Sequence, residues 1–139
     1  MGKLTEIADA VLEVLNSSGM SPEFTAERTL LPVYDLKALK TLKVSVVPKG
    51  RKITQGTRIH TIDEIQIDIG VQKKISNDSE LDILMKLVED ICILFKAERL
   101  EGYPTAICVK KENEPIYDPG HLRQFRQFTS VVTLTFKVF

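Results

Sequence analysis

The chain opens with a helical pattern of apolar residues. Within residues 3–18, apolar side chains recur at helical spacing on one broad stripe, and acidic residues mark the opposite side. Gly19 and Pro22 follow, and these residue types commonly end a helix or prevent its continuation. The pattern predicts an amphipathic helix over residues 3–18.

Residues 62–74 carry the clearest strand pattern. Apolar and polar residues alternate from Glu64 to Gln72, which is typical of a strand with one buried face and one polar face. Shorter strands are predicted over residues 24–31 and 43–47, where β-branched and apolar residues are ended by prolines. Strands are therefore expected both before and within the central part of the chain.

A second helix is predicted over residues 79–99. Asn77, Asp78 and Ser79 supply helix-start chemistry, and the apolar stripe that follows is wider than the stripe of the first helix. We therefore expect this helix to be more deeply covered. After it, residues 105–110 predict a short strand.

One long strand is predicted over residues 123–139, which gives the element order α-β-β-β-α-β-β. No repeated βαβ unit occurs, so the order favours an α+β fold, a mainly antiparallel sheet with two helices packed on one face. A chain of 139 residues, 43% of them hydrophobic, predicts a single domain over residues 1–139. No apolar run approaches the ~20 residues of a membrane span, so no membrane contact is expected.

Charge is distributed in blocks, although the 19 basic and 19 acidic residues cancel. Residues 36–60 hold seven bases and no acid, whereas residues 61–90 hold eight acids and three bases. Blocks of opposite sign on a neutral chain favour a surface that meets a complementary surface, such as one on a second copy of the chain.

The basic block ends in a segment that predicts a projecting loop or hairpin around residues 48–60. This segment is polar, and it contains glycines at positions 50 and 56. Its cations are the candidate residues for an interface or a lumen surface. They are Lys49, Arg51, Lys52 and Arg58.

No catalytic constellation emerges from the residue pattern, so we predict a protein that is not an enzyme and needs no cofactor or metal. His60 and Glu64 would lie ~13 Å apart on a strand, too far for a metal pair. Asp118, His121 and Ser130 follow in order, but no nucleophile turn accompanies them.

Two other function classes remain open at this level. A small enzyme would require a pocket that places His60 or His121 beside a carboxylate. A nucleic-acid-binding module would use the basic block over residues 36–60 against backbone phosphates. That block contains no aromatic residue on which a base could stack.

Several stretches of the chain resemble small phage or prophage proteins encoded among head–tail joining genes. The similarity covers most of the chain. It rests on IADAVLEVLN (7–16), FTAER (24–28), PVYDL (32–36), VSVVPKG (44–50), IQIDIGVQK (65–73), LD (81–82), LVED (87–90), ENEP (112–115) and FTSV (128–131). Among these proteins, the chain is most similar to the tail terminators, also called tail completion or tail-to-head joining proteins.

This resemblance implies a sheet flanked by helices and a hexameric ring that ends growth of the tail tube. The implied partners are further copies of the chain, the tail tube protein and the head connector or completion protein. Transient contact with DNA in the lumen is also implied, as is a place in the virion tail after assembly in the host bacterial cytoplasm. Head completion proteins and other minor tail proteins share this length and texture, and they are the alternative assignment.

Overall fold

The fold is α+β, with the element order α-β-β-β-α-β-β-α-β in the part of the chain that the structure describes. This computed structural model describes residues 2–20, 24–29, 41–55, 61–95, 99–100 and 102–138. The helices are α1 (Lys3–Asn16), α2 (Asp78–Leu94) and α3 (Pro119–Phe125). The strands are β1 (Ala26–Arg28), β2 (Lys43–Gln55), β3 (Thr61–Lys74), β4 (Arg99–Leu100), β5 (Tyr103–Glu112) and β6 (Gln127–Val138).

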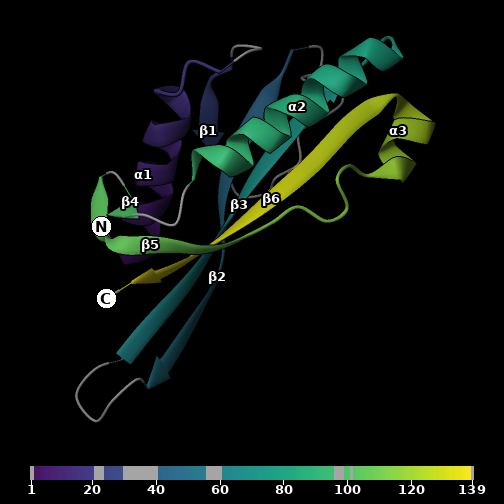
Figure 1. Ribbon diagram of the computed structural model, residues 1–139. Helices are drawn as coiled ribbons and strands as arrows, with labels where there is room; N and C mark the ends of the chain where they lie inside the picture. The colour runs from purple at the N-terminus through teal and green to yellow at the C-terminus, as the bar shows by residue number, and fades with distance from the viewer. Residues whose placement is uncertain are drawn as a thin grey trace.

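The strands form one mixed sheet in the order β1-β2-β3-β6-β5-β4. Strand β1 runs parallel to β2, and the other neighbouring pairs are antiparallel. The prediction of a mainly antiparallel sheet is therefore confirmed only in part. The C-terminal strand β6 lies inside the sheet, between β3 and β5, where its alternating apolar residues can be covered (Figure 1).

The hydrophobic core lies between one face of the sheet and the helices α1 and α2. The β3 residues Ile65, Ile67 and Ile69 are fully buried, as the alternation predicts. They lie opposite apolar residues of β6 in the antiparallel register, and Ile7 of α1 and Leu84 of α2 belong to the same buried cluster. The periodicity of the sequence thus identifies the core correctly.

The expected element order is wrong near the C-terminus, because it omits β4 and α3. Residues 119–125 form a short helix, whereas the sequence predicts that the final strand begins at residue 123. Pro119 occupies the first turn of α3, where a missing N–H costs nothing. The helix ends at Arg126, whose φ of 53° is left-handed. Strand β6 begins directly after this turn.

Strand β2 also runs further than predicted, because Pro48 does not end it. The N–H of Thr29 donates to the carbonyl of Val46 at 3.1 Å, so the polar groups of Val46 point away from β3. Pro48 lies two residues later and faces the same way, so its missing N–H removes no bond to β3. A bulge between Pro48 and Gly50 shifts the register, and β2 continues to Gln55.

Other boundaries differ by a few residues from the predicted ones. Helix α1 ends at Asn16 and α2 at Leu94, both short of the expected ends at residues 18 and 99. Strand β5 is longer than the predicted strand over residues 105–110. The expected strand over residues 24–31 corresponds to β1, and residues 30 and 31 lie outside the described residues.

In the described residues, no helix is long and apolar enough to cross a membrane.

Truncating a core side chain of α2 should destabilise the fold. Leu84 is 2% exposed, so we expect Leu84→Ala to lower the free energy of unfolding by ~2–5 kcal/mol. The neighbouring Ile83 is 52% exposed, so Ile83→Ala is the matched control, with an expected effect below ~0.5 kcal/mol. Urea denaturation followed by circular dichroism measures both. Equal losses for the two variants would mean that the buried face of α2 is misassigned.

Candidate interaction surface on the β2–β3 arm

The far ends of β2 and β3 form an arm that projects from the sheet. Residues 50–55 of β2 pair with residues 61–66 of β3 after the bulge, and we call residues 49–55 and 61–66 the arm. Residues 63–66 also pair with β6, so the root of the arm is still part of the sheet, and only residues 61 and 62 of β3 extend beyond β6. In Figure 1 the arm extends to the lower left, away from α2 and α3. Residues 51–55 are all exposed. Arg58 lies outside the described residues.

A nearly buried carboxylate fastens the root of the arm. The guanidinium of Arg51 donates twice to Asp63, from Nε to Oδ1 at 3.0 Å and from Nη2 to Oδ2 at 2.9 Å. The ammonium of Lys3 donates to Oδ2 at 2.7 Å. The side chain of Asp63 is only 9% exposed. Such bidentate, charge-assisted pairs have a more fixed geometry than ordinary surface ion pairs.

These contacts shift the ionisation of Asp63. Hydrogen bonds from Arg51 and then from Lys3 lower the pKa of this carboxyl to about 2, because they stabilise its charged form more than burial opposes it. Lys3 is the first residue of α1. The arm is therefore tied through Asp63 to the first turn of α1, 60 residues away in sequence.

Lys49 faces a second carboxylate near the root of the arm. Its Nζ lies 4.0 Å from Oδ1 of Asp68, which also accepts a hydrogen bond from the hydroxyl of Thr133 at 2.6 Å. Lys49 and Thr133 line a hollow of about 380 Å³ together with Glu112 and other neighbours. Lys49 thus lies beside acidic side chains of the same chain.

Lys52 differs from the other described cations of the arm. It lies opposite Glu64 in the register of β2 and β3, but Glu64 is 4.0 Å from Lys137 instead. Within the described residues, Lys52 takes part in no ion pair. The next residue, Ile53, is 60% exposed and points to the other face of the strand, because successive side chains alternate.

The four candidate residues thus separate into distinct roles. Arg51 fastens the arm, and Lys49 lies near Asp68, so neither is a free cation. Of the three described candidates, Lys49, Arg51 and Lys52, only Lys52 is exposed and has no acidic partner in the described structure. The block of bases that the sequence shows at residues 36–60 is therefore less positive in the fold, because acids from the following block neutralise part of it.

The residues Asp118, His121 and Ser130 do not assemble into a catalytic triad. The hydroxyl of Ser130 donates to the carbonyl of Ile116 at 2.6 Å. Asp118 Oδ1 instead accepts the backbone N–H groups of Gly120 and His121 and thereby caps α3. Asp118 Oδ2 lies 3.8 Å from His121 Nε2, which is beyond hydrogen-bond distance.

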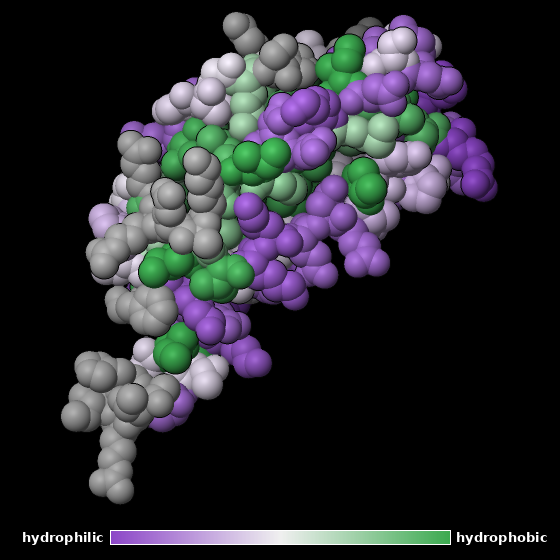
Figure 2. Space-filling view, in the orientation of Figure 1, coloured by the Kyte–Doolittle hydropathy of each residue, from purple (hydrophilic) through white to green (hydrophobic). Residues whose placement is uncertain are grey.

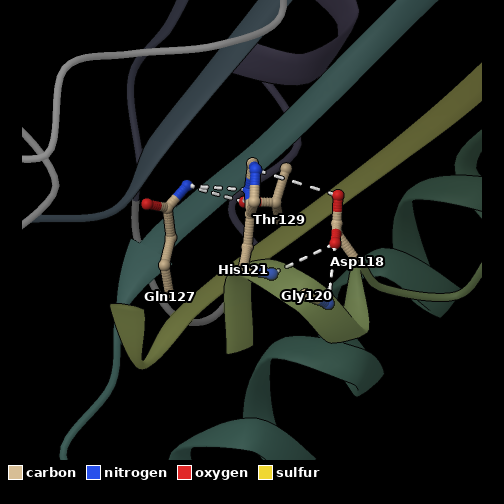
Figure 3. A network of polar contacts seen from close by, with 5 residues as sticks. All are labelled: Asp118, Gly120, His121, Gln127 and Thr129. Carbon is tan, nitrogen blue, oxygen red and sulfur yellow. Dashed lines mark hydrogen bonds and ion pairs between the residues drawn. The ribbon is translucent and has the colours of Figure 1, made fainter. Parts of the chain in front are cut away.

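His121 belongs to a polar network between α3 and the start of β6 (Figure 3). Its Nδ1 lies 2.9 Å from the hydroxyl of Thr129, which also accepts a hydrogen bond from Nε2 of Gln127 at 2.7 Å. Thr129 and Gln127 are buried, so these contacts satisfy polar atoms that water reaches poorly. The network positions α3 at the end of the sheet.

The described residues contain no group of three or more His, Cys, Asp and Glu side chains that could hold a metal ion. Cys92 and Cys108 are free thiols, and burial raises the pKa of each. A thiol with a raised pKa is a poor nucleophile near neutral pH. His60 lies outside the described residues.

No protein-family model matches the chain, and no curated protein matches it.

Removing the charge of Asp63 should loosen the arm and lower stability. Asp63→Asn leaves Arg51 and Lys3 without their carboxylate, and we expect a loss of ~1–3 kcal/mol in the free energy of unfolding, the range for hydrogen bonds to charged groups. The matched control is Asp90→Asn, which removes the more exposed ion pair with Lys86 and should cost ~0.5 kcal/mol or less. Hydrogen exchange in residues 49–55 should rise only in Asp63→Asn.

Lowering the pH should remove the stabilisation that the Asp63 carboxylate gives to the unmodified chain. The pKa of Asp63 falls from 3.8 to about 2 on folding, so its stabilisation is complete above about pH 4 and is lost as pH falls towards 2. The stability difference between the unmodified chain and Asp63→Asn should therefore shrink over that window in urea titrations. A difference that stays constant from pH 5 to about 2 would contradict the ion-pair assignment.

Proposed function

We propose that this chain is a non-catalytic structural protein of a phage virion, a tail terminator. In this proposal it forms a homo-oligomeric ring, expected to be a hexamer, at the head-proximal end of the tail tube. The ring ends tube growth and joins the tail to the head. It is assembled in the bacterial cytoplasm and remains in the virion tail.

The observation that carries the proposal is the fastened, exposed arm. Residues 51–55 are all exposed, yet Arg51 and Lys3 hold the root of the arm in place through Asp63. A protein gains little stability from such an arm when it acts alone. An arm of this kind is useful for reaching a neighbouring subunit or the lumen of a ring.

Assembly through such a ring follows from general rules of symmetry. A head-to-tail contact between identical subunits uses two different surfaces on each copy, and it closes into a ring when the rotation allows. The tail tube protein would meet one side of the ring and the head connector the other. Charged contacts across such interfaces steer association and fix register more than they add affinity.

Loss of this protein should produce a specific defect in phage particles. In lysates of a phage that lacks the gene, electron microscopy should show overlong tails that are not attached to heads. Normal-length tails without heads would favour the alternative of a head completion or minor tail protein. Normal particles would contradict any role at the junction.

Altering the exposed arm residues Lys52 and Ile53 should impair the same step without unfolding the chain. We expect the double variant with Lys52→Glu and Ile53→Ser to reduce the yield of joined particles at least about tenfold, because one close charge contact can contribute that much. The matched control carries Lys110→Glu and Val109→Ser, which alter a similarly exposed pair on β5. Circular dichroism checks that both variants fold. Equal particle yields for the two variants would argue against a contact through the arm.

A further inference from the structure

Ion pairing within the chain leaves a few cations uncompensated, and several of these gather at one end of the sheet. Among the described residues, Lys74, Arg123 and Arg126 are exposed and form no ion pair. Phe125 stands between the two arginines in sequence and is 43% exposed. We call these four residues the basic end.

The pairing of β3 with β6 brings the basic end together. Lys74, the last residue of β3, is the register partner of Gln127, the first residue of β6. The N–H of Ile75 donates to the carbonyl of Arg126 at 2.8 Å, and Arg123 lies one turn earlier, in α3. In Figure 1 this end of the sheet is opposite the arm. The two sources of positive charge are about 50 residues apart in sequence, and only the fold joins them.

Helix α2 presents a surface of opposite character. Asp82 and Glu89 are exposed, form no ion pair in the described structure, and lie seven residues apart on one side of the helix. Ile83 follows Asp82, Ile93 lies one turn beyond Glu89, and they are 52% and 57% exposed. We call Asp82, Ile83, Glu89 and Ile93 the outer face of α2; Lys86, which pairs with Asp90 at 2.6 Å, lies on the same side of the helix between the two acids. Figure 2, seen from the α2 side, shows hydrophobic and hydrophilic side chains interspersed there.

We propose that the basic end of one copy docks on the outer face of α2 of a second copy. Free cations would meet free carboxylates, and the ring of Phe125 would cover exposed isoleucine. Arginine and aromatic residues are enriched at the centres of protein interfaces. The chain has no net charge, so copies do not repel one another overall.

Within one copy, no ion pair joins these two surfaces in the described residues, so each remains available to a neighbour. The contact uses different surfaces on the two partners, which is the head-to-tail arrangement that a ring requires. The inference therefore rests on the proposed ring and names two surfaces that would form its subunit contact.

A polyanion fits the basic end less well than a second copy does. Asp78 is exposed, forms no ion pair in the described structure and follows Lys74 by only four residues. A phosphate backbone at Lys74 would approach this carboxylate, whereas a protein surface can place a cation or a polar group there. The outer face of α2 supplies negative charge for the cations of the basic end and exposed isoleucines for Phe125.

A mixing experiment with purified full-length chains tests the proposal. Arg123→Glu alters only the basic end, and Glu89→Lys alters only the outer face of α2. Each variant alone should associate at least about tenfold more weakly than the unmodified chain, as measured by analytical ultracentrifugation. In an equimolar mixture the two variants can alternate. The altered basic end of one variant then meets the altered α2 face of the other, and the two unaltered surfaces meet at the next junction. Opposite charges therefore meet at every junction, and association should recover to within about threefold of the unmodified chain.

Matched controls separate this contact from a general effect of charge. Lys110→Glu and Glu13→Lys reverse exposed charges outside both surfaces and should leave association unchanged. Circular dichroism and thermal unfolding verify folding of each variant, and Lys74→Glu replaces Arg123→Glu if that variant does not fold.

Three results would overturn the proposal. The first is an unmodified chain that stays monomeric up to about millimolar concentration, where even weak contacts are populated. The second is unchanged association in both single variants. The third is failure of the mixture to recover, together with loss of binding to a 20-nucleotide DNA in Arg123→Glu, which would assign the basic end to a polyanion.

The outcome is independent of the assay for the proposed function. If association recovers in the mixture but phage particles without the gene are normal, the contact between copies is supported and the role at the tail is contradicted. If particles without the gene have unattached, overlong tails but Arg123→Glu and Glu89→Lys do not change association, the role is supported and this contact is contradicted.

Discussion

The antiparallel register between β3 and β6 determines what meets at both ends of the sheet. It sets Ile65, Ile67 and Ile69 against the apolar face of β6 and so forms the centre of the core. At one end the same register brings Lys74 beside the α3–β6 turn. At the other end Asp63 pairs with Val138, so only Thr61 and Ile62 of β3 extend beyond β6. A slip of one residue would turn every one of these side chains to the other face, so the core and both candidate surfaces depend on this pairing.

Charge in this molecule is organised by contacts that are distant in sequence. Asp63 accepts hydrogen bonds from two cationic side chains, Arg51 of the neighbouring strand and Lys3 of α1. The result is an arm whose root is fixed and in which Lys52 is the one cation without an ion pair among the described residues. Elsewhere in the described structure, Asp82 and Glu89 on α2 and Arg123 and Arg126 near α3 form no ion pair. A neutral chain with separate unpaired surfaces of opposite sign is suited to contacts between copies, and this arrangement underlies both proposals.

Residue pattern alone predicts the elements whose signal is local and periodic. The alternation from Glu64 to Gln72 predicts β3 and its buried face, and the apolar stripes predict α1 and α2. The residue pattern does not predict features that depend on tertiary contacts. Pro48 is compatible with β2 because its backbone nitrogen faces away from β3, so no hydrogen bond to β3 is lost. The cap by Asp118 begins α3 where the residue pattern predicts no helix, and the partner of Arg51 lies on another strand. A local count of charges therefore overstates how basic the arm is.

We propose that this chain occupies the junction between phage head and tail. Immunogold electron microscopy of intact particles, with antibodies raised against the purified chain, tests this claim most directly. The account predicts label at the head–tail junction of each particle and none along the tail. Label on the head shell or the tail tip, or particles without label beside abundant soluble protein, would contradict it.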